Sequence, residues 1–168
     1  MIQRYGKVGL VASVAFFLFL VVLNNLTDYR SNYLFVENVL NMSTTFEGNQ
    51  LMWRRIESPL IHHLFYWGII AWEAAAMVLC GWGSWLLWKN REAPAGTFQQ
   101  AKQWAVAGLI LSLLQWFVAF ITVGGEWFLM WQSPTWNGQD AAHRMFVILG
   151  IILIFLVMRD EELENQAK

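Results

Sequence analysis

One carboxyl group lies in the middle of a long apolar stretch of this chain. The stretch Leu64–Trp88 has 25 residues, and Glu73 is its only ionisable side chain besides Tyr66 and Cys80. As a helix rising about 1.5 Å per residue, it exceeds the roughly 30 Å of hydrocarbon in a bilayer, and Glu73 lies about 13 Å deep. An acid at that depth must be paired, protonated or hydrated. Glu73 is therefore a candidate for proton or ion transfer, or a structural pin between helices.

The next apolar run offers a polar partner for Glu73. Small and polar residues follow one another there at steps of 4, 3, 4, 3 and 4: Gly108, Ser112, Gln115, Ala119, Thr122 and Glu126. Because the two runs are antiparallel, Gln115, about 16 Å from the start of its run, comes to the level of Glu73. We expect a hydrogen bond between Glu73 and Gln115, in an intramembrane polar seam that includes Ser112 and Tyr66.

Histidine and carboxylate side chains near one end of these runs suggest a second kind of site. His62 and His63 begin the second run, and the topology places Glu126 and His143 on the same side. Such ligands suit zinc or copper, and a haem could bridge a histidine pair. However, adjacent histidines diverge by about 100° on a helix, and no HxxxH or ExxH spacing occurs. We therefore expect no cofactor, with a bound lipid, metal or haem as the alternatives.

Four apolar runs must position these groups. Hydrophobic residues make up 57% of the chain and charged residues 14%, against about 45–50% and about 25% in soluble domains. The predicted spans are residues 8–24, 64–88, 104–123 and 141–158. Tryptophan, used 11 times, gathers near their ends, as in an aromatic belt. The sequence thus predicts an all-α membrane four-helix bundle, residues 1–168 forming a single integral membrane domain.

The basic residues predict the orientation of the bundle. Arg4 and Lys7 precede the first run, and Lys89, Arg91 and Lys102 flank the second connection. By the positive-inside rule these segments, and with them both termini, are cytoplasmic. The connections 25–63 and 124–140 then lie outside.

These two outer connections are expected to form a structured extracytoplasmic cap. The first is long for a helical hairpin, and residues 33–42 show the apolar spacing of a short interfacial helix. The second contains an Asn-Gly turn signal and several aromatic residues. The candidate cap residues are Trp53, Arg54, Trp127, Trp131, Trp136 and Asn137.

Composition and motifs exclude several classes of function. The net charge of −1 and the lack of a nucleic-acid-binding motif argue against nucleic-acid partners. There is no GxSxG motif and no phosphate-binding loop, and the single Cys80 lies inside an apolar run. A non-enzymatic protein is therefore expected.

Several segments, most of them outside the apolar runs, resemble a bacterial family of predicted small integral membrane proteins of unknown function. They are the stretches 42–49, 58–59, 62–63, 124–127, 130–133 and 135–139, with Trp53-Arg54 and Trp72-Glu73. The resemblance covers nearly the whole chain. It implies four helices in a bacterial inner membrane, and it implies no activity, ligand or partner.

Three hypotheses about function follow from these patterns. The first is a polytopic protein that acts by self-association, or as an accessory subunit of another membrane protein, through its cap, because aromatic residues mark interfaces. The second is a conduit for protons, ions or a small apolar ligand along the Glu73–Gln115 seam. The third is a metal or haem site at the outer mouth.

Overall fold

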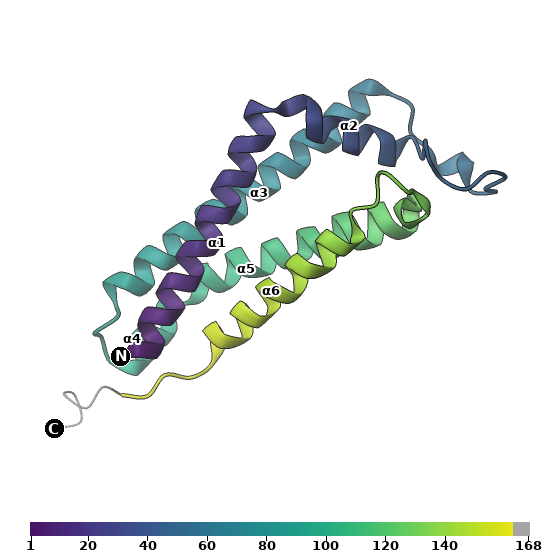
Figure 1. Cartoon of the computed structure of the whole chain (residues 1–168). Helices are drawn as coiled ribbons and strands as arrows, with labels where there is room; N and C mark the ends of the chain where they lie inside the picture. The colour runs from purple at the N-terminus through teal and green to yellow at the C-terminus, as the bar shows by residue number, and fades with distance from the viewer. Residues whose placement is uncertain (163–168) are drawn as a thin grey trace.

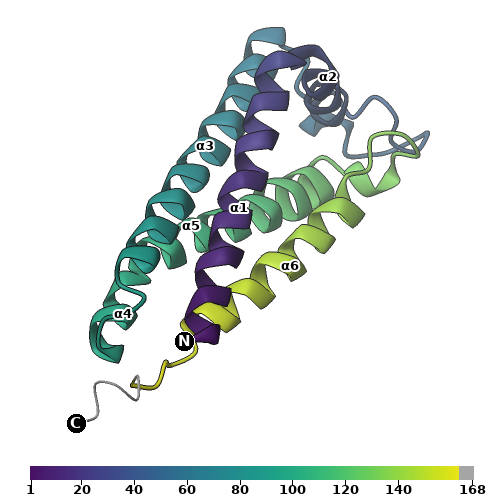
Figure 2. The ribbon, with the colours of Figure 1, turned by 60° about the vertical axis from the view of Figure 1, so that its left-hand side comes forward.

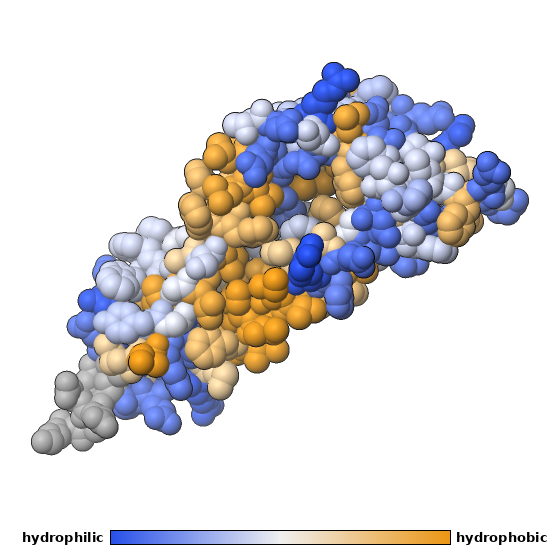
Figure 3. Space-filling model, in the orientation of Figure 1, coloured by the Kyte–Doolittle hydropathy of each residue, from blue (hydrophilic) through white to orange (hydrophobic). Residues whose placement is uncertain are grey.

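In the computed structural model, which describes residues 1–162, the chain is helical, and no strand occurs in this range. Four helical segments are long and apolar enough to cross a membrane: Ile2–Thr27, Pro59–Lys89, Ala95–Trp127 and Gln139–Val157. Each overlaps one predicted span. An apolar belt separates two more hydrophilic ends of the molecule (Figure 3). The predicted all-α membrane bundle is thus confirmed, and residues 163–168 of the predicted domain lie outside the described residues.

The elements follow in the order α1 (Ile2–Thr27), α2 (Tyr29–Leu40), η1 (Met52–Arg54), α3 (Pro59–Lys89), α4 (Ala95–Ala101), α5 (Gln103–Leu114), η2 (Gln115–Trp127), η3 (Met130–Gln132) and α6 (Gln139–Val157). Helix α1 packs along α3, and α6 packs along α5 and η2. The two pairs meet near the N-terminus and diverge toward the other end, where α2 lies across the opening (Figures 1 and 2). We call the first end the terminal end and the second, with residues 41–58 and 128–138, the cap end.

Small residues explain why α3 and α5 stay close at the terminal end. A Cβ atom added to Gly108 would lie 2.6 Å from Cys80 Sγ, and one added to Gly83 would collide with the backbone of Ala105. Such residues let transmembrane helices approach closely enough for strong van der Waals contact. Beyond Leu114, α3 has few contacts with η2.

The buried side chains form two clusters that correspond to these two regions. One, including Val11, Ala76 and Leu109, fills the terminal half of the bundle. The other, including Val36 and Phe128, lies beneath the cap. The short amphipathic helix α2 contributes its apolar face to this cluster. The interfacial helix expected around residues 33–42 is therefore present, although it begins earlier, at Tyr29.

The third span departs from the predicted α-helix at Gln115. From Gln115 to Trp127 the backbone is a π-helix, in which hydrogen bonds run from residue i to i+5. A π-helix has more residues per turn than an α-helix, so side chains spaced alternately three and four apart no longer follow one face. The predicted stripe consequently ends at Gln115: Gly108, Ser112 and Gln115 are buried, whereas Thr122 and Glu126 are exposed.

Candidate functional site

Glu73 is the centre of a buried hydrogen-bond network that joins three helices. Its side chain is 4% exposed. Gln115 Nε2, at the first residue of η2, donates to Glu73 Oε1 over 3.1 Å, which is the contact expected from the sequence. Asn25 Nδ2, near the end of α1, donates to Glu73 Oε2 over 2.7 Å. Each carboxyl oxygen thus has an amide donor from a different helix.

Asn25 connects this network to the cap end of the bundle. Its Oδ1 atom accepts from Asn32 Nδ2 over 2.7 Å and from Tyr66 OH over 3.3 Å. Tyr66 OH also donates to the main-chain oxygen of Asn25, over 3.2 Å. Because Oδ1 already accepts twice, the orientation of the Asn25 amide is determined, with Nδ2 directed to Glu73.

The sequence analysis missed Asn25 because it ended the first span at residue 24. In the structure α1 continues to Thr27, which brings Asn25 inside the bundle, 5% exposed. A polar residue directly after an apolar run was the available signal. Conversely, Ser112 Oγ donates to Gly108 O of its own helix over 3.0 Å, so it lies on the seam without contributing to the network.

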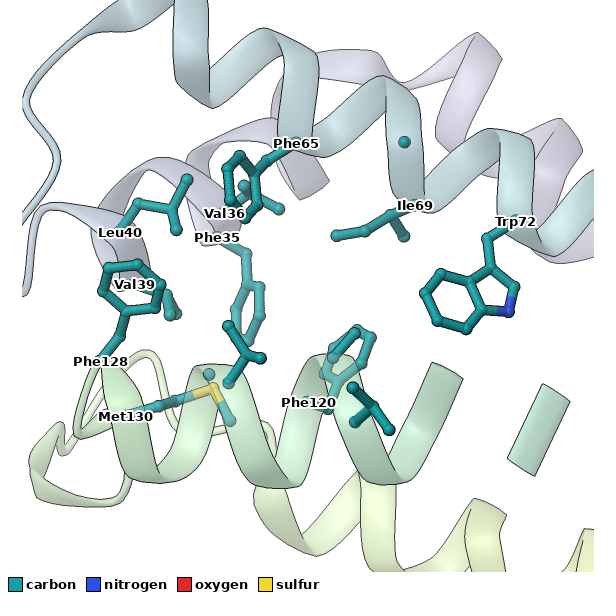
Figure 4. A pocket seen from close by; sticks show the side chains of 15 residues that line it. Phe35, Val36, Val39, Leu40, Phe65, Ile69, Trp72, Phe120, Phe128 and Met130 are labelled. Atoms are coloured by element: carbon teal, nitrogen blue, oxygen red, sulfur yellow. The ribbon is translucent and has the colours of Figure 1, made fainter. Parts of the chain in front are cut away.

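An apolar cleft opens beside this network, in the cap half of the bundle. It encloses about 330 Å³ between α2, α3 and η2, and none of its lining residues is charged. From η2 come Val118, Ala119, Phe120, Val123 and Gly124, and Phe128 follows directly after its last residue. In Figure 4 the labelled side chains of α2, α3 and η2 point into this space from three sides.

The two ends of the cleft differ. Leu40, Phe128 and Met130 lie together at one end, near the cap, and Trp72 lies at the other (Figure 4). Trp72 Nε1 donates to Leu111 O of α5 over 2.9 Å. Gly68, on the α3 side between these ends, has no atom within 4 Å of the position a Cβ would take.

The structure does not bring the candidate metal ligands together. No three His, Cys, Asp or Glu side chains within residues 1–162 lie close enough together to hold a metal ion. His62 is buried, and its Nε2 donates to Ile56 O over 2.7 Å, whereas His63 is exposed and its Nδ1 lies 2.8 Å from Tyr29 OH. Glu126 and His143 are exposed. Adjacent histidines point to different sides of α3, as the 100° rotation per residue requires.

The candidate cap residues do come together at the cap end. Arg54 lies 4.7 Å above the Trp127 ring, and its NH1 donates to Trp127 O over 3.3 Å. Trp53 contacts Trp127 edge to face, with 5.9 Å between ring centroids. Arg54 therefore binds the aromatic ring and main chain of the second connection. Arg54 NH1 also donates to Glu126 O, over 3.5 Å.

The other candidate cap residues hold the two connections against each other. Trp131 meets Phe46 edge to face, with 5.7 Å between centroids. Trp136 packs edge to face on Phe35 of α2, at 6.3 Å. Asn137 Oδ1 accepts from the main-chain N–H of Gln139 over 3.1 Å, at the start of α6. The cap is thus a structured unit.

A second polar cluster, at the terminal end, was not predicted. Lys7 and Lys102, 1% and 2% exposed, both bind the carboxylate of Asp160, at 2.9 and 2.5 Å, and both donate to Met158 O. Burial alone raises the pKa of Asp160, but the hydrogen bonds and charges of Lys102 and Lys7 outweigh it, so the pKa lies below its ordinary 3.8. Arg4, also buried, donates to Ala93 O over 2.6 Å. These basic residues therefore tie the chain after α6 to α1 and α5.

The comparisons with known proteins agree with this architecture. Searches of curated proteins and of solved structures return no match. The family described as "Predicted small integral membrane protein (DUF2165)" matches residues 3–159, which is nearly the whole chain. With four helices long enough to cross a membrane and the match over their whole length, the chain belongs to this family of small integral membrane proteins.

Proposed function

We propose that this protein is a non-enzymatic membrane protein that holds the hydrocarbon chain of a lipid-like molecule in the cleft between α2, α3 and η2. The observation that carries the proposal is the cleft itself. Its volume of about 330 Å³ falls in the range of about 300–1,000 Å³ that is usual for small-molecule sites. This proposal keeps the apolar ligand of the second sequence hypothesis but moves it from the polar seam to the cleft beside it.

The shape of the cleft favours a single chain over a helix from another protein. A helix with its side chains is about 10 Å across, and the cleft is a gap between helices that are packed in the same bundle. A hydrocarbon chain is much thinner. The cleft also opens on the outer side of the bundle, because Phe65, Gly68 and Val118 are exposed. A chain could therefore enter sideways from the surrounding lipid.

The chemistry of the lining favours a neutral hydrocarbon. The residues that line the cleft are apolar or glycine, so a charged group inside it would lose its hydration without gaining a partner. Neither Glu73 nor Gln115 lines the cleft, and the hydrogen bonds of Glu73 go to Asn25 and Gln115. The affinity for a hydrocarbon chain then comes from the packing of the chain against the residues that line the cleft.

Photolabelling in lipid nanodiscs tests the proposal. The probe is a long-chain alcohol with a diazirine near its chain end, with unlabelled decanol as competitor. Specific binding predicts a saturable part of the labelling, removed by decanol and mapped to the peptides of α3 and η2 that line the cleft. Labelling that decanol does not reduce, or that spreads evenly over the lipid-facing helices, would overturn the proposal.

A matched pair of glycine variants makes the test specific to the cleft. Gly68→Leu places a side chain in the open space of the cleft, and it should remove most of the saturable labelling. Gly9→Leu adds the same side chain to an exposed position of α1 that also has no neighbour within 4 Å. Gly9→Leu should label like the wild type. Replacement of a helical glycine does not weaken the helix, so both variants are expected to fold.

A second function, association through the cap, is supported by a different observation. Trp53, Phe46, Trp127 and Trp131 are between 45% and 69% exposed although they pair with one another. Exposed aromatic groups on a structured surface suit a contact with a second copy or with another membrane protein. Extraction in mild detergent followed by mass measurement tests it: a monomer without a co-purifying protein would contradict association.

A further inference from the structure

Trp72 closes the end of the cleft that lies deeper in the bundle. Figure 4 shows its indole ring projecting from α3 into the space between α3 and η2, at the end opposite Leu40 and Phe128. The hydrogen bond from Trp72 Nε1 to Leu111 O, 2.9 Å, holds the ring across the gap between α3 and α5. Leu111 lies on α5 four residues before the π-helix begins. The ring therefore bridges the point from which the two helices diverge.

Beyond Trp72 the bundle offers no continuation of the cleft. Ala76, one turn further along α3, and Leu109 on α5 are both 0% exposed. Gly108 lies so close to Cys80 that an added Cβ would be 2.6 Å from the sulfur. A chain that lies in the cleft along the bundle axis therefore ends against Trp72.

The depth of the cleft then limits the length of chain that it accepts. From Phe65 to Trp72, both in the lining, α3 advances seven residues, or about 10 Å. One leaflet of hydrocarbon is about 15 Å thick, half of the roughly 30 Å of the bilayer core. Along α3 the lining thus extends over about two thirds of the layer that a full-length lipid chain occupies.

We propose that Trp72 is the specificity-determining residue of the cleft, and that it selects hydrocarbon chains shorter than those of the bulk lipid. The proposal rests on the proposed function, because it concerns the same site. A chain that is too long has to leave its last methylene groups outside the cleft or bend back. Those methylene groups contribute no contact with the lining, and the bend costs conformational freedom.

Competition with alcohols of different length tests this inference, using the same photoprobe in nanodiscs. Decanol, tetradecanol and octadecanol are compared at equal mole fraction in the bilayer. In the wild type, decanol should displace the probe about tenfold more effectively than octadecanol, because the bend in the longer chain costs conformational freedom and about 1.4 kcal/mol corresponds to a factor of ten. Trp72→Ala removes the ring that closes the cleft, so octadecanol should become as effective as decanol.

Two further variants separate length selection from a general loss of structure. Trp72→Phe loses the hydrogen bond to Leu111 but keeps a ring, so it should keep the preference for decanol. Trp82→Ala removes an exposed tryptophan of the same helix that does not line the cleft, and it should behave like the wild type. If Trp72→Ala does not fold, Trp72→Leu, which shortens the side chain less, is measured in its place.

The outcomes distinguish this inference from the proposed function. Saturable labelling with equal competition by all three alcohols in the wild type would overturn the length selection and leave the proposed function standing. Length selection that persists unchanged in Trp72→Ala, or in Trp72→Leu if that variant is used, would overturn the role of Trp72. The absence of saturable labelling in the wild type would overturn both.

Discussion

Replacing Asn25 by alanine should lower the stability of the bundle more than replacing Gln115 by alanine, because Asn25 makes the stronger hydrogen bond to Glu73. Both residues donate to the same carboxyl group, but the hydrogen bond from Asn25 is 2.7 Å long and the one from Gln115 is 3.1 Å. Asn25 is also held in place by Asn32 and Tyr66, so it loses less freedom when it binds Glu73. The appropriate measurement is the coupling free energy of each pair, obtained from a double-mutant cycle with Glu73→Ala.

The expected magnitudes follow from the two geometries. Interhelical hydrogen bonds in membranes contribute about 0.6 kcal/mol on average and about 1.7 kcal/mol at most. The hydrogen bond from Asn25 is the shorter one and its donor is already held by Asn32 and Tyr66, so it belongs near the upper end of this range. We therefore expect a coupling of about 1.5 kcal/mol between Asn25 and Glu73, and about 0.6 kcal/mol between Gln115 and Glu73.

Reversible unfolding in mixed micelles of mild detergent and dodecyl sulfate, followed by circular dichroism, gives these free energies. The set comprises the wild type, the three single alanine variants and the two double variants. A coupling for Asn25 that is no larger than that for Gln115 would refute the reasoning from geometry. Couplings below about 0.3 kcal/mol for both pairs would show that the network does not stabilise the bundle.

Two further predictions concern the terminal half. The carboxylate of Asp160 has a lowered pKa in the folded protein, so its stabilising effect is complete above the ordinary value of 3.8 and is lost as the pH falls through the folded pKa. The melting temperatures of the wild type and Asp160→Asn should therefore differ at neutral pH and converge in acid. A difference in melting temperature that stays constant with pH would contradict this. Gly108→Leu should destabilise the protein by about 3 kcal/mol or more, because α3 and α5 would have to separate. Gly9→Leu should change the unfolding free energy little. Equal effects of the two variants in the same unfolding assay would contradict the close packing of α3 against α5 at Gly108.

The sequence was sufficient for features that depend on local composition and on depth. Hydrophobicity summed over about 20 residues identifies a span without any knowledge of its neighbours. That Glu73 and Gln115 lie at the same depth follows from the helical rise per residue and from the antiparallel direction of consecutive helices. The short helix before the cap could be predicted from its apolar spacing. The cap residues could be predicted from their position in the connections.

Other features required the tertiary structure. The position of Asn25 depends on how far α1 continues past its apolar run, and the faces of η2 depend on its π-helical hydrogen bonds, which rotate Thr122 and Glu126 away from the bundle. Two of the basic residues that indicated orientation, Lys7 and Lys102, proved to be buried around Asp160. The cleft exists because α3 and η2 diverge where α2 lies between them. Each of these results from packing between segments distant in the chain, which no local pattern of residues determines.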